Sequence, residues 1–169
     1  PDAKSVQAGE VEGAGKTLLP GLIDTHVHLS APGAVMDYSD PKVREELRQI
    51  DIGRSMRRAA AAYLFSGVTA FRSAGDGLDT LEMTARDLER GTRNGAEMFF
   101  AGPMFTAEGG HGSEYFRHIP EPYKQQAMEQ TVRTPKAPAE AREQVRALKA
   151  RGGTSIKAIL ESGSGSMPF

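Results

Sequence analysis

Short apolar runs alternate with longer amphipathic stretches along the chain, and this alternation predicts the secondary structure. Apolar runs bounded by Gly and Pro turn signals predict strands at residues 22–29, 68–71, 98–101 and 155–160. Apolar residues that recur every three or four positions predict helices at residues 41–66, 79–93 and 139–150. Strands that alternate with helices are typical of a parallel sheet with crossover helices, so the predicted fold class is α/β.

The stretch between residues 106 and 138 shows neither periodicity. It contains a Gly-Gly-His-Gly segment at residues 109–112 and several prolines from Pro120 on. We expect a long irregular loop there, and such loops in compact domains are usually functional or disordered. The Gly- and Ser-rich residues 161–169 predict a flexible tail.

Composition and charge narrow the classes of partner. The 169 residues include 21 Lys and Arg against 22 Asp and Glu, which gives a net charge of −1. We therefore expect no nucleic-acid partner and no membrane partner, since no apolar run approaches the roughly 18 residues of a membrane span. The absence of Cys excludes disulfides, Cys-ligated zinc and thiol nucleophiles, but it assigns no compartment.

The pair His26 and His28 is a candidate for metal chemistry. Residues two apart in a strand point to the same face, so the two imidazoles could converge on one metal ion. The pair ends an apolar strand that opens with a Pro-Gly turn, and strand ends are where α/β folds place functional groups. The alternative is that both are surface or capped histidines.

Lys157 lies inside the apolar run at residues 155–160. A lysine in such a strand is costly to bury as a cation. It is therefore either a buried lysine with altered charge that acts as a ligand or base, or a side chain that reaches solvent from an edge strand.

His111 and Arg72 are candidates for substrate contact. The glycines on both sides of His111 let the backbone approach a ligand closely, although an ordinary loop histidine is the alternative. Arg72 and Asp76 flank the turn after the second predicted strand, so Arg72 contacts either the substrate or Asp76. An ion pair between them at the surface would contribute little stability.

Four segments together resemble a known family. Residues 16–28 (KTLLPGLIDTHVH) closely resemble the first barrel strand of the amidohydrolase superfamily of metal-dependent hydrolases, and residues 67–72 (GVTAFR) resemble its second strand. The Gly-Gly-His-Gly segment after the third strand and residues 155–157 (SIK) in the fourth resemble its prolidase-like branch of Xaa-dipeptide hydrolases. The resemblance covers nearly the whole chain in the right order.

This resemblance implies a (β/α)₈ TIM barrel with two divalent metal ions, most often zinc. It implies that His26 and His28 bind the more buried metal, and that Lys157 is carboxylated by CO₂ and bridges both metals. The resemblance also implies that His111 contacts the substrate. We expect Arg72 to take part in substrate binding as well. Residues 1–19 resemble the end of the small β-domain that precedes the barrel, and residues 20–169 resemble the barrel itself.

The family's chemistry implies hydrolysis of an amide or peptide bond in a small substrate by a metal-bridging hydroxide. Arg72 and the Gly-Gly-His-Gly segment favour a dipeptidase. A cyclic amide hydrolase, of the imidazolonepropionase or dihydroorotase type, is the alternative within the same class.

The resemblance stops at the fourth strand. The family also takes a histidine from each of strands five and six and an aspartate from strand eight, and a full barrel takes about 250 residues. After Lys157 the sequence has no His and no Asp. We therefore expect the first half of a barrel, about four βα units, which is inactive by itself.

Three origins of such a half-barrel remain open. It is a partial sequence or truncated gene, a fragment of a cleaved enzyme whose C-terminal half is missing, or a chain that closes a barrel as a homo-oligomer. A non-catalytic half-barrel that binds metal or oligomerises is the alternative from outside the enzymes.

Overall fold

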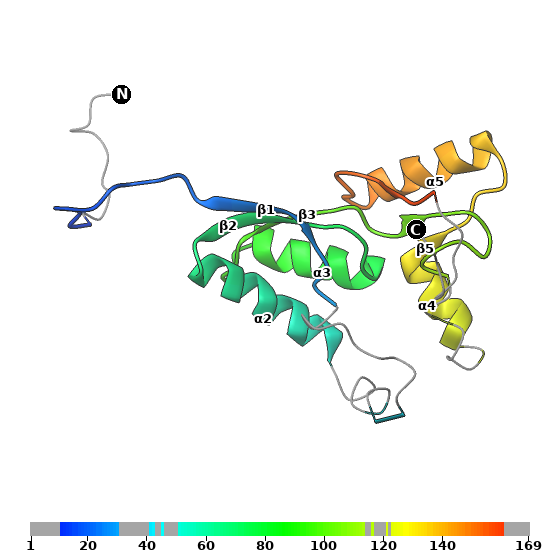
Figure 1. Cartoon of the computed structure of the whole chain (residues 1–169), viewed down its shortest axis with the longest axis horizontal. Coiled ribbons are helices and arrows are strands. Elements are labelled where there is room, and N and C mark those ends of the chain that lie inside the picture. The colour runs from blue at the N-terminus through cyan, green and yellow to red at the C-terminus, as the bar shows by residue number, and fades with distance from the viewer. Residues whose placement is uncertain are drawn as a thin grey trace.

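The computed structural model describes residues 11–30, 41–42, 45, 51–113, 116, 121 and 123–160. These residues form two three-stranded sheets in which every strand pair is parallel (Figure 1). No helix in this part of the chain is long and apolar enough to cross a membrane.

The first sheet has the strand order β1-β2-β3. Its strands are β1 (Leu22–Val27), β2 (Val68–Ser73) and β3 (Glu97–Phe100). Helix α2 (Ile52–Phe65) precedes β2 and helix α3 (Leu78–Glu89) precedes β3, and Figure 1 shows both helices on one face of the sheet. Each helix is thus a crossover between two parallel strands, as the sequence pattern predicts.

The second sheet has the strand order β5-β4-β6. Its strands are β4 (Met104–Phe105), β5 (Val132–Arg133) and β6 (Lys157–Ala158). Helix α4 (Tyr123–Thr131) leads into β5, and helix α5 (Pro138–Ala150) connects β5 to β6. Strands β1 and β6 do not pair with each other, so the described residues form no closed barrel.

Gly102 and Pro103 separate β3 from β4. Gly102 has a φ of +67°, and a Cβ there would lie 2.7 Å from Leu148 Cδ1. The break therefore requires glycine, because another residue would be strained at this positive φ and would clash with Leu148. Hydrogen bonds from Thr154 N to Phe100 O (2.9 Å) and from Ile159 N to Phe105 O (2.8 Å) join the β6 segment to both sides of the break. Strands β3 and β4 therefore act as one interrupted strand, beside which the β6 segment lies.

The apolar core fills the space between the first sheet and its helices. Phe71 of β2 is completely buried and stacks on Tyr63 of α2, with ring centroids 5.1 Å apart. The same core cluster includes Val27, Met56, Ala60, Leu81, Met98, Phe100 and Leu148. The opposite face of the sheet is much more open, since Leu22 is 64% and Phe99 39% exposed.

The helix ends follow local sequence signals. The Asp51 side chain accepts a hydrogen bond from Arg54 N at 2.9 Å, which caps the first turn of α2. Gly67 follows the end of α2 with a φ of +83°, a left-handed conformation in which glycine commonly ends a helix. The predicted helix at 41–66 is thus confirmed over α2, and much of its first third lies outside the described residues.

Strands are confirmed at all four predicted positions, although β6 spans only two residues of the predicted run at 155–160. The prediction of an irregular loop over residues 106–138 is wrong in its second half, which forms α4 and β5. No residue of α4 is buried, so the helix lacks the apolar stripe from which its period could be read. The assignment of residues 1–19 to the end of a small β-domain stays a prediction.

Candidate metal site

His26 lies in β1 and His28 directly follows it. Their ring centroids are 5.5 Å apart, with the ring planes inclined by 55°, and both side chains are exposed. The His28 Nδ1–H donates a hydrogen bond of 2.8 Å to the Gly75 carbonyl, which leaves Nε2 as the free ring nitrogen. A backbone carbonyl on one imidazole nitrogen is the usual way in which a metal-binding histidine is oriented.

Asp76 holds the end of β1 in place. Its carboxylate is 2% exposed and accepts hydrogen bonds from Leu29 N (2.9 Å) and Ser30 N (3.0 Å). It also accepts from the hydroxyl groups of Ser30 and Ser73. This role of Asp76 was not predicted from the sequence. The alternative of an Arg72–Asp76 ion pair is wrong, because the Asp76 carboxylate is turned toward the residues that follow His28.

Lys157 lies in β6, opposite Met104 of β4 in the parallel register, and is half-buried. Desolvation lowers the pKa of His26, and the positive charges of Lys157 and Arg72 and the neighbouring His28 lower it further. Lys157 therefore lies near enough to His26 to act on it electrostatically. The three predicted metal ligands thus come from the end of β1 and from β6, and their sharing of one metal ion stays a prediction.

Arg72 crosses this side of the sheet from β2. Its Nε donates to Ser155 Oγ at 2.8 Å, and its Nη1 donates to the Thr25 carbonyl at 3.1 Å. Arg72 therefore connects the β1 backbone to the residues that precede Lys157. The predicted substrate contact of Arg72 stays a prediction, and its bridging role had no signal in the sequence because Ser155 lies 83 residues away.

His111 lies in a turn that follows β4. The turn is closed by hydrogen bonds from Gly110 N to the Ala107 carbonyl (2.9 Å) and from Ser113 N to the Gly110 carbonyl (3.1 Å). A Cβ on Gly112 would lie 2.9 Å from Met104 Cε, so the turn packs closely on that methionine.

Met104 also approaches the histidine pair. A Cβ on Gly75 would lie 3.0 Å from Met104 Cγ and 3.4 Å from His28 Cε1. The Met104 side chain therefore lies between the His111 turn and the residues that orient His28. His111 belongs to the same end of the sheets as the predicted ligands.

The donor set fits a metal ion only if Lys157 takes part. No group of three or more His, Asp or Glu side chains suited to a metal gathers among the described residues. Two imidazoles on one side of β1, one with its Nδ1 already bonded to a carbonyl, supply two neutral nitrogen donors. A third donor from Lys157 requires an uncharged amine or a carbamate, because an ammonium has no lone pair.

No protein-family model matches the chain, and no curated protein matches it significantly. Among solved structures, an amidohydrolase is 26% identical with a TM-score of 0.65, and the match covers 92% of this chain and 37% of that one. A prolidase complexed with N-methylphosphonate-L-proline is 25% identical with a TM-score of 0.63, covering 88% of this chain and 35% of that one.

The A. niger ochratoxinase is 23% identical with a TM-score of 0.60, and the match covers 85% of this chain and 34% of that one, which supports the fold alone. The chain thus spans about a third of the length of the solved structures that it matches. The resemblance to amidohydrolases, prolidases among them, is therefore confirmed for a part of the length of those proteins.

Proposed function

We propose that this chain carries part of the active site of a metal-dependent amidohydrolase that cleaves an amide or peptide bond in a small substrate. The observation that carries the proposal is the His26–His28 pair at the end of β1, together with the Arg72 side chain that joins the Thr25 carbonyl of β1 to Ser155, two residues before Lys157. It is supported by the similarity to a prolidase that is complexed with a proline derivative.

His26 and His28 would hold a divalent metal ion, zinc being the expected one, and Lys157 would supply the donor shared with a second ion. When bound, a divalent metal ion polarises the substrate carbonyl and activates a water molecule at neutral pH. The protein's part is to hold neutral imidazoles in place. His28 is fixed by its bond to the Gly75 carbonyl, and the surroundings of His26 disfavour its protonation, since they lower its pKa.

Lys157 would act as a carbamate. Its neutral Nζ forms a bond to the carbon of CO₂ and releases one proton, so that the ammonium cation is replaced by an anionic carboxylate. This change removes the repulsion between a lysine cation and a bound metal.

Arg72 and His111 would contact the substrate. The Nη2 group of Arg72 has no acceptor among the described residues, while Nε and Nη1 are held by Ser155 and Thr25. A guanidinium fixed in this way can present its remaining donor to a carbonyl or carboxylate of a small peptide. His111, on a tight turn at the same end, would approach the substrate from the β4 side.

Metal content tests the proposal. The 169-residue chain would be loaded with zinc in the presence of bicarbonate, dialysed, and analysed for bound metal. We expect His26→Ala, His28→Ala and Lys157→Ala each to lose metal. The matched controls His111→Ala and Lys149→Ala should retain it, because neither side chain belongs to the ligand set.

Two further measurements address Lys157 itself. Loading with ¹³C-bicarbonate should give a carbamate carbon signal in the wild-type chain that Lys157→Ala lacks, and short carboxylates such as acetate should restore part of the metal content of that variant. Unchanged metal content in Lys157→Ala would contradict the assignment. By itself the chain should hydrolyse no dipeptide, because its sequence has no His or Asp after Lys157 for proton transfer.

A further inference from the structure

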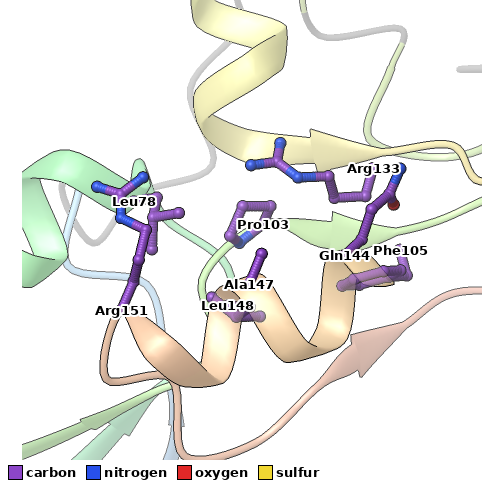
Figure 2. A pocket seen from close by; sticks show the side chains of 8 residues that line it. All are labelled: Leu78, Pro103, Phe105, Arg133, Gln144, Ala147, Leu148 and Arg151. Atoms are coloured by element: carbon purple, nitrogen blue, oxygen red, sulfur yellow. The ribbon is translucent and has the colours of Figure 1, made fainter. Parts of the chain in front are cut away.

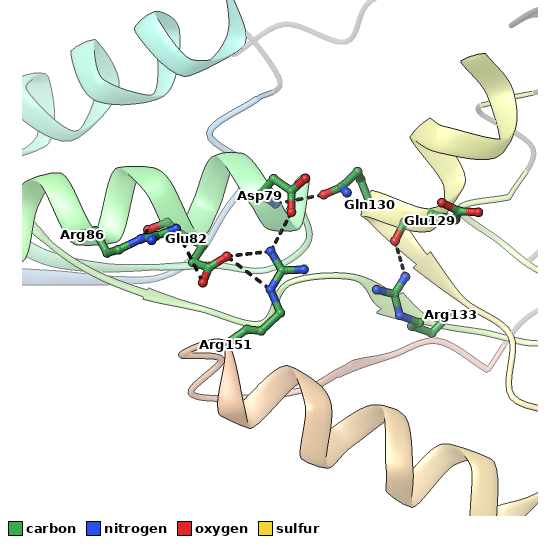
Figure 3. A network of polar contacts seen from close by, with 7 residues as sticks. All are labelled: Asp79, Glu82, Arg86, Glu129, Gln130, Arg133 and Arg151. Atoms are coloured by element: carbon green, nitrogen blue, oxygen red, sulfur yellow. Dashed lines mark hydrogen bonds and ion pairs between the residues drawn. The ribbon is translucent and has the colours of Figure 1, made fainter. Parts of the chain in front are cut away.

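Helix α3 differs at its two ends. At the N-terminal end Asp79 and Glu82 pair with Arg151, whose Nη2 lies 2.6 Å from an oxygen of each carboxylate (Figure 3). Leu78, the first residue of the helix, lines a small cavity beside α5 together with Arg151 (Figure 2). The C-terminal end runs into residues 91–94, which are all exposed. The link from α3 to β3 is therefore open to water.

Asn94 ends this exposed link and is the only asparagine in the sequence. Neither its side-chain amide nor the N–H of the next residue, Gly95, makes a hydrogen bond within the part of the chain that the structure describes. Because Gly95 has no Cβ, no side chain obstructs the approach of its backbone nitrogen to the Asn94 side chain. The two groups are therefore adjacent, unobstructed and free of hydrogen bonds that would hold them apart.

Gly95 cannot be exchanged for another residue without strain. A Cβ on Gly95 would lie 2.7 Å from Leu88 Cδ2 and 3.0 Å from Ala60 Cβ. The next amide, Ala96 N, donates a hydrogen bond of 3.0 Å to the Ala60 carbonyl. The start of β3 thus approaches α2 and α3 so closely that the position after Asn94 requires glycine.

We propose that Asn94 is a site of spontaneous deamidation and isoaspartate formation in the folded protein. The Gly95 nitrogen loses its proton and forms a bond to Asn94 Cγ, and the side-chain amide leaves as ammonia. The product is a five-membered succinimide ring, which one water molecule then opens. Opening at the side-chain carbonyl gives aspartate, and opening at the main-chain carbonyl gives isoaspartate, in which the backbone runs through Cβ and Cγ.

The two products differ in their effect on the fold. Aspartate keeps the length of the backbone and adds a negative charge at an exposed position. Isoaspartate lengthens the backbone by one carbon directly before Gly95, where the chain packs against Leu88 and Ala60. The longer backbone should displace Gly95 and weaken the hydrogen bond from Ala96 N to Ala60. We therefore expect isoaspartate alone to destabilise the chain.

A second acidic or amide residue that precedes a glycine is Asp76, which is followed by Gly77. Asp76 is 2% exposed, and its carboxylate accepts hydrogen bonds from Leu29 N and Ser30 N. It cannot turn toward Gly77 N without losing these bonds, and a carboxylate is a weaker electrophile than a carboxamide. We therefore expect isoaspartate at position 94 and not at position 76.

The test is to age the 169-residue chain in a mildly alkaline buffer and to map its peptides by mass spectrometry. Electron-transfer fragmentation separates isoaspartate from aspartate. A synthetic peptide of residues 90–99 gives the reference rate. Asn94 in the folded chain should react within about tenfold of that rate, because the site needs no unfolding to react. The control Asn94→Gln should give no product at this position, since its longer side chain would have to close a six-membered ring.

Thermal unfolding then separates the two products. The isoaspartate-containing fraction of the aged chain should unfold at a lower temperature than fresh protein, and the variant Asn94→Asp should unfold like the wild type. The assignment would be overturned by an Asn94 that stays intact in the folded chain while the peptide deamidates, or by isoaspartate that forms equally at position 76. An isoaspartate fraction with an unchanged unfolding temperature would overturn the effect on packing.

Discussion

The two faces of the first sheet differ in what they contribute. On the face toward α2 and α3, Phe71 and Phe100 are at most 3% exposed and belong to one continuous apolar core. On the other face Leu22 is 64% exposed, and Arg72 donates a hydrogen bond to Ser155, two residues before Lys157 of the second sheet. The first face stabilises the fold, and the second carries the candidate chemistry.

This difference follows from strand geometry. Neighbouring residues of a strand point to opposite faces, so Phe71 enters the core while Arg72 points away from it. Substitutions on the helix face should therefore change stability, and substitutions on the open face should change ligand binding.

Phe71→Ala should reduce the free energy of unfolding by about 4 kcal/mol, because it leaves a cavity in the core and removes the stack on Tyr63. Urea unfolding followed by circular dichroism measures the loss. The control is Phe99→Ala on the open face, where the side chain is 39% exposed and we expect a much smaller change. Similar losses in the two variants would show that the open face is packed as well as the helix face.

Asp76→Ala should cost about 3 kcal/mol, because it leaves the amides of Leu29 and Ser30 without their acceptor. It should also weaken metal binding, since those amides lie directly after His28. Asp76→Asn keeps one carbonyl oxygen and should lose less in both assays. A destabilised Asp76→Ala chain that binds metal with wild-type affinity would refute the role of Asp76 in positioning His28.

Gly95→Ala should cost about 2 kcal/mol through overpacking. A Cβ at this position would lie 2.7 Å from Leu88 Cδ2 and 3.0 Å from Ala60 Cβ, between α2, α3 and the start of β3. Gly13→Ala is the matched control, because nothing lies within 4 Å of its Cβ position. Equal unfolding midpoints for the two variants would mean that Leu88 and Ala60 shift at little cost to accommodate a Cβ at Gly95.

The smallest expected effect concerns the titration of His26. Its pKa should lie below 6.5, because desolvation and then the charge of Lys157 disfavour the imidazolium. Lys157→Gln should raise the pKa of His26, and the exposed control Lys149→Gln should leave it unchanged. The C2 proton of His26, followed by NMR from acid to neutral pH, gives both values. A His26 that titrates identically in both variants would place Lys157 too far away to share a metal ion with it.

The parts of the fold that the sequence predicts are those with a strong period. Helices α2, α3 and α5 each have buried residues on one side, and strands β1 to β3 are bounded by Gly or Pro. Strands β4 and β5 are two residues long, too short for any alternation to show. They exist because parallel neighbours pair with them, which depends on tertiary structure.

The candidate site likewise has residues that the sequence predicts and residues that it does not. His26 and His28 are close in sequence, so strand geometry alone predicts that they share a face. Asp76 could not be predicted, because the backbone amides that it holds are 46 and 47 residues away. The bridge from Arg72 to Ser155 spans 83 residues and likewise leaves no local signal.

Paramagnetic broadening by Mn²⁺ tests most directly whether His26, His28 and Lys157 share one metal ion. Substoichiometric Mn²⁺ would be added to the 169-residue chain with bicarbonate present, and side-chain proton signals would be followed by NMR. The imidazole signals of His26 and His28 and the Cε protons of Lys157 should broaden together at the lowest metal concentration, while those of Lys149 stay sharp. Broadening of the two histidines with a sharp Lys157 signal would contradict the account.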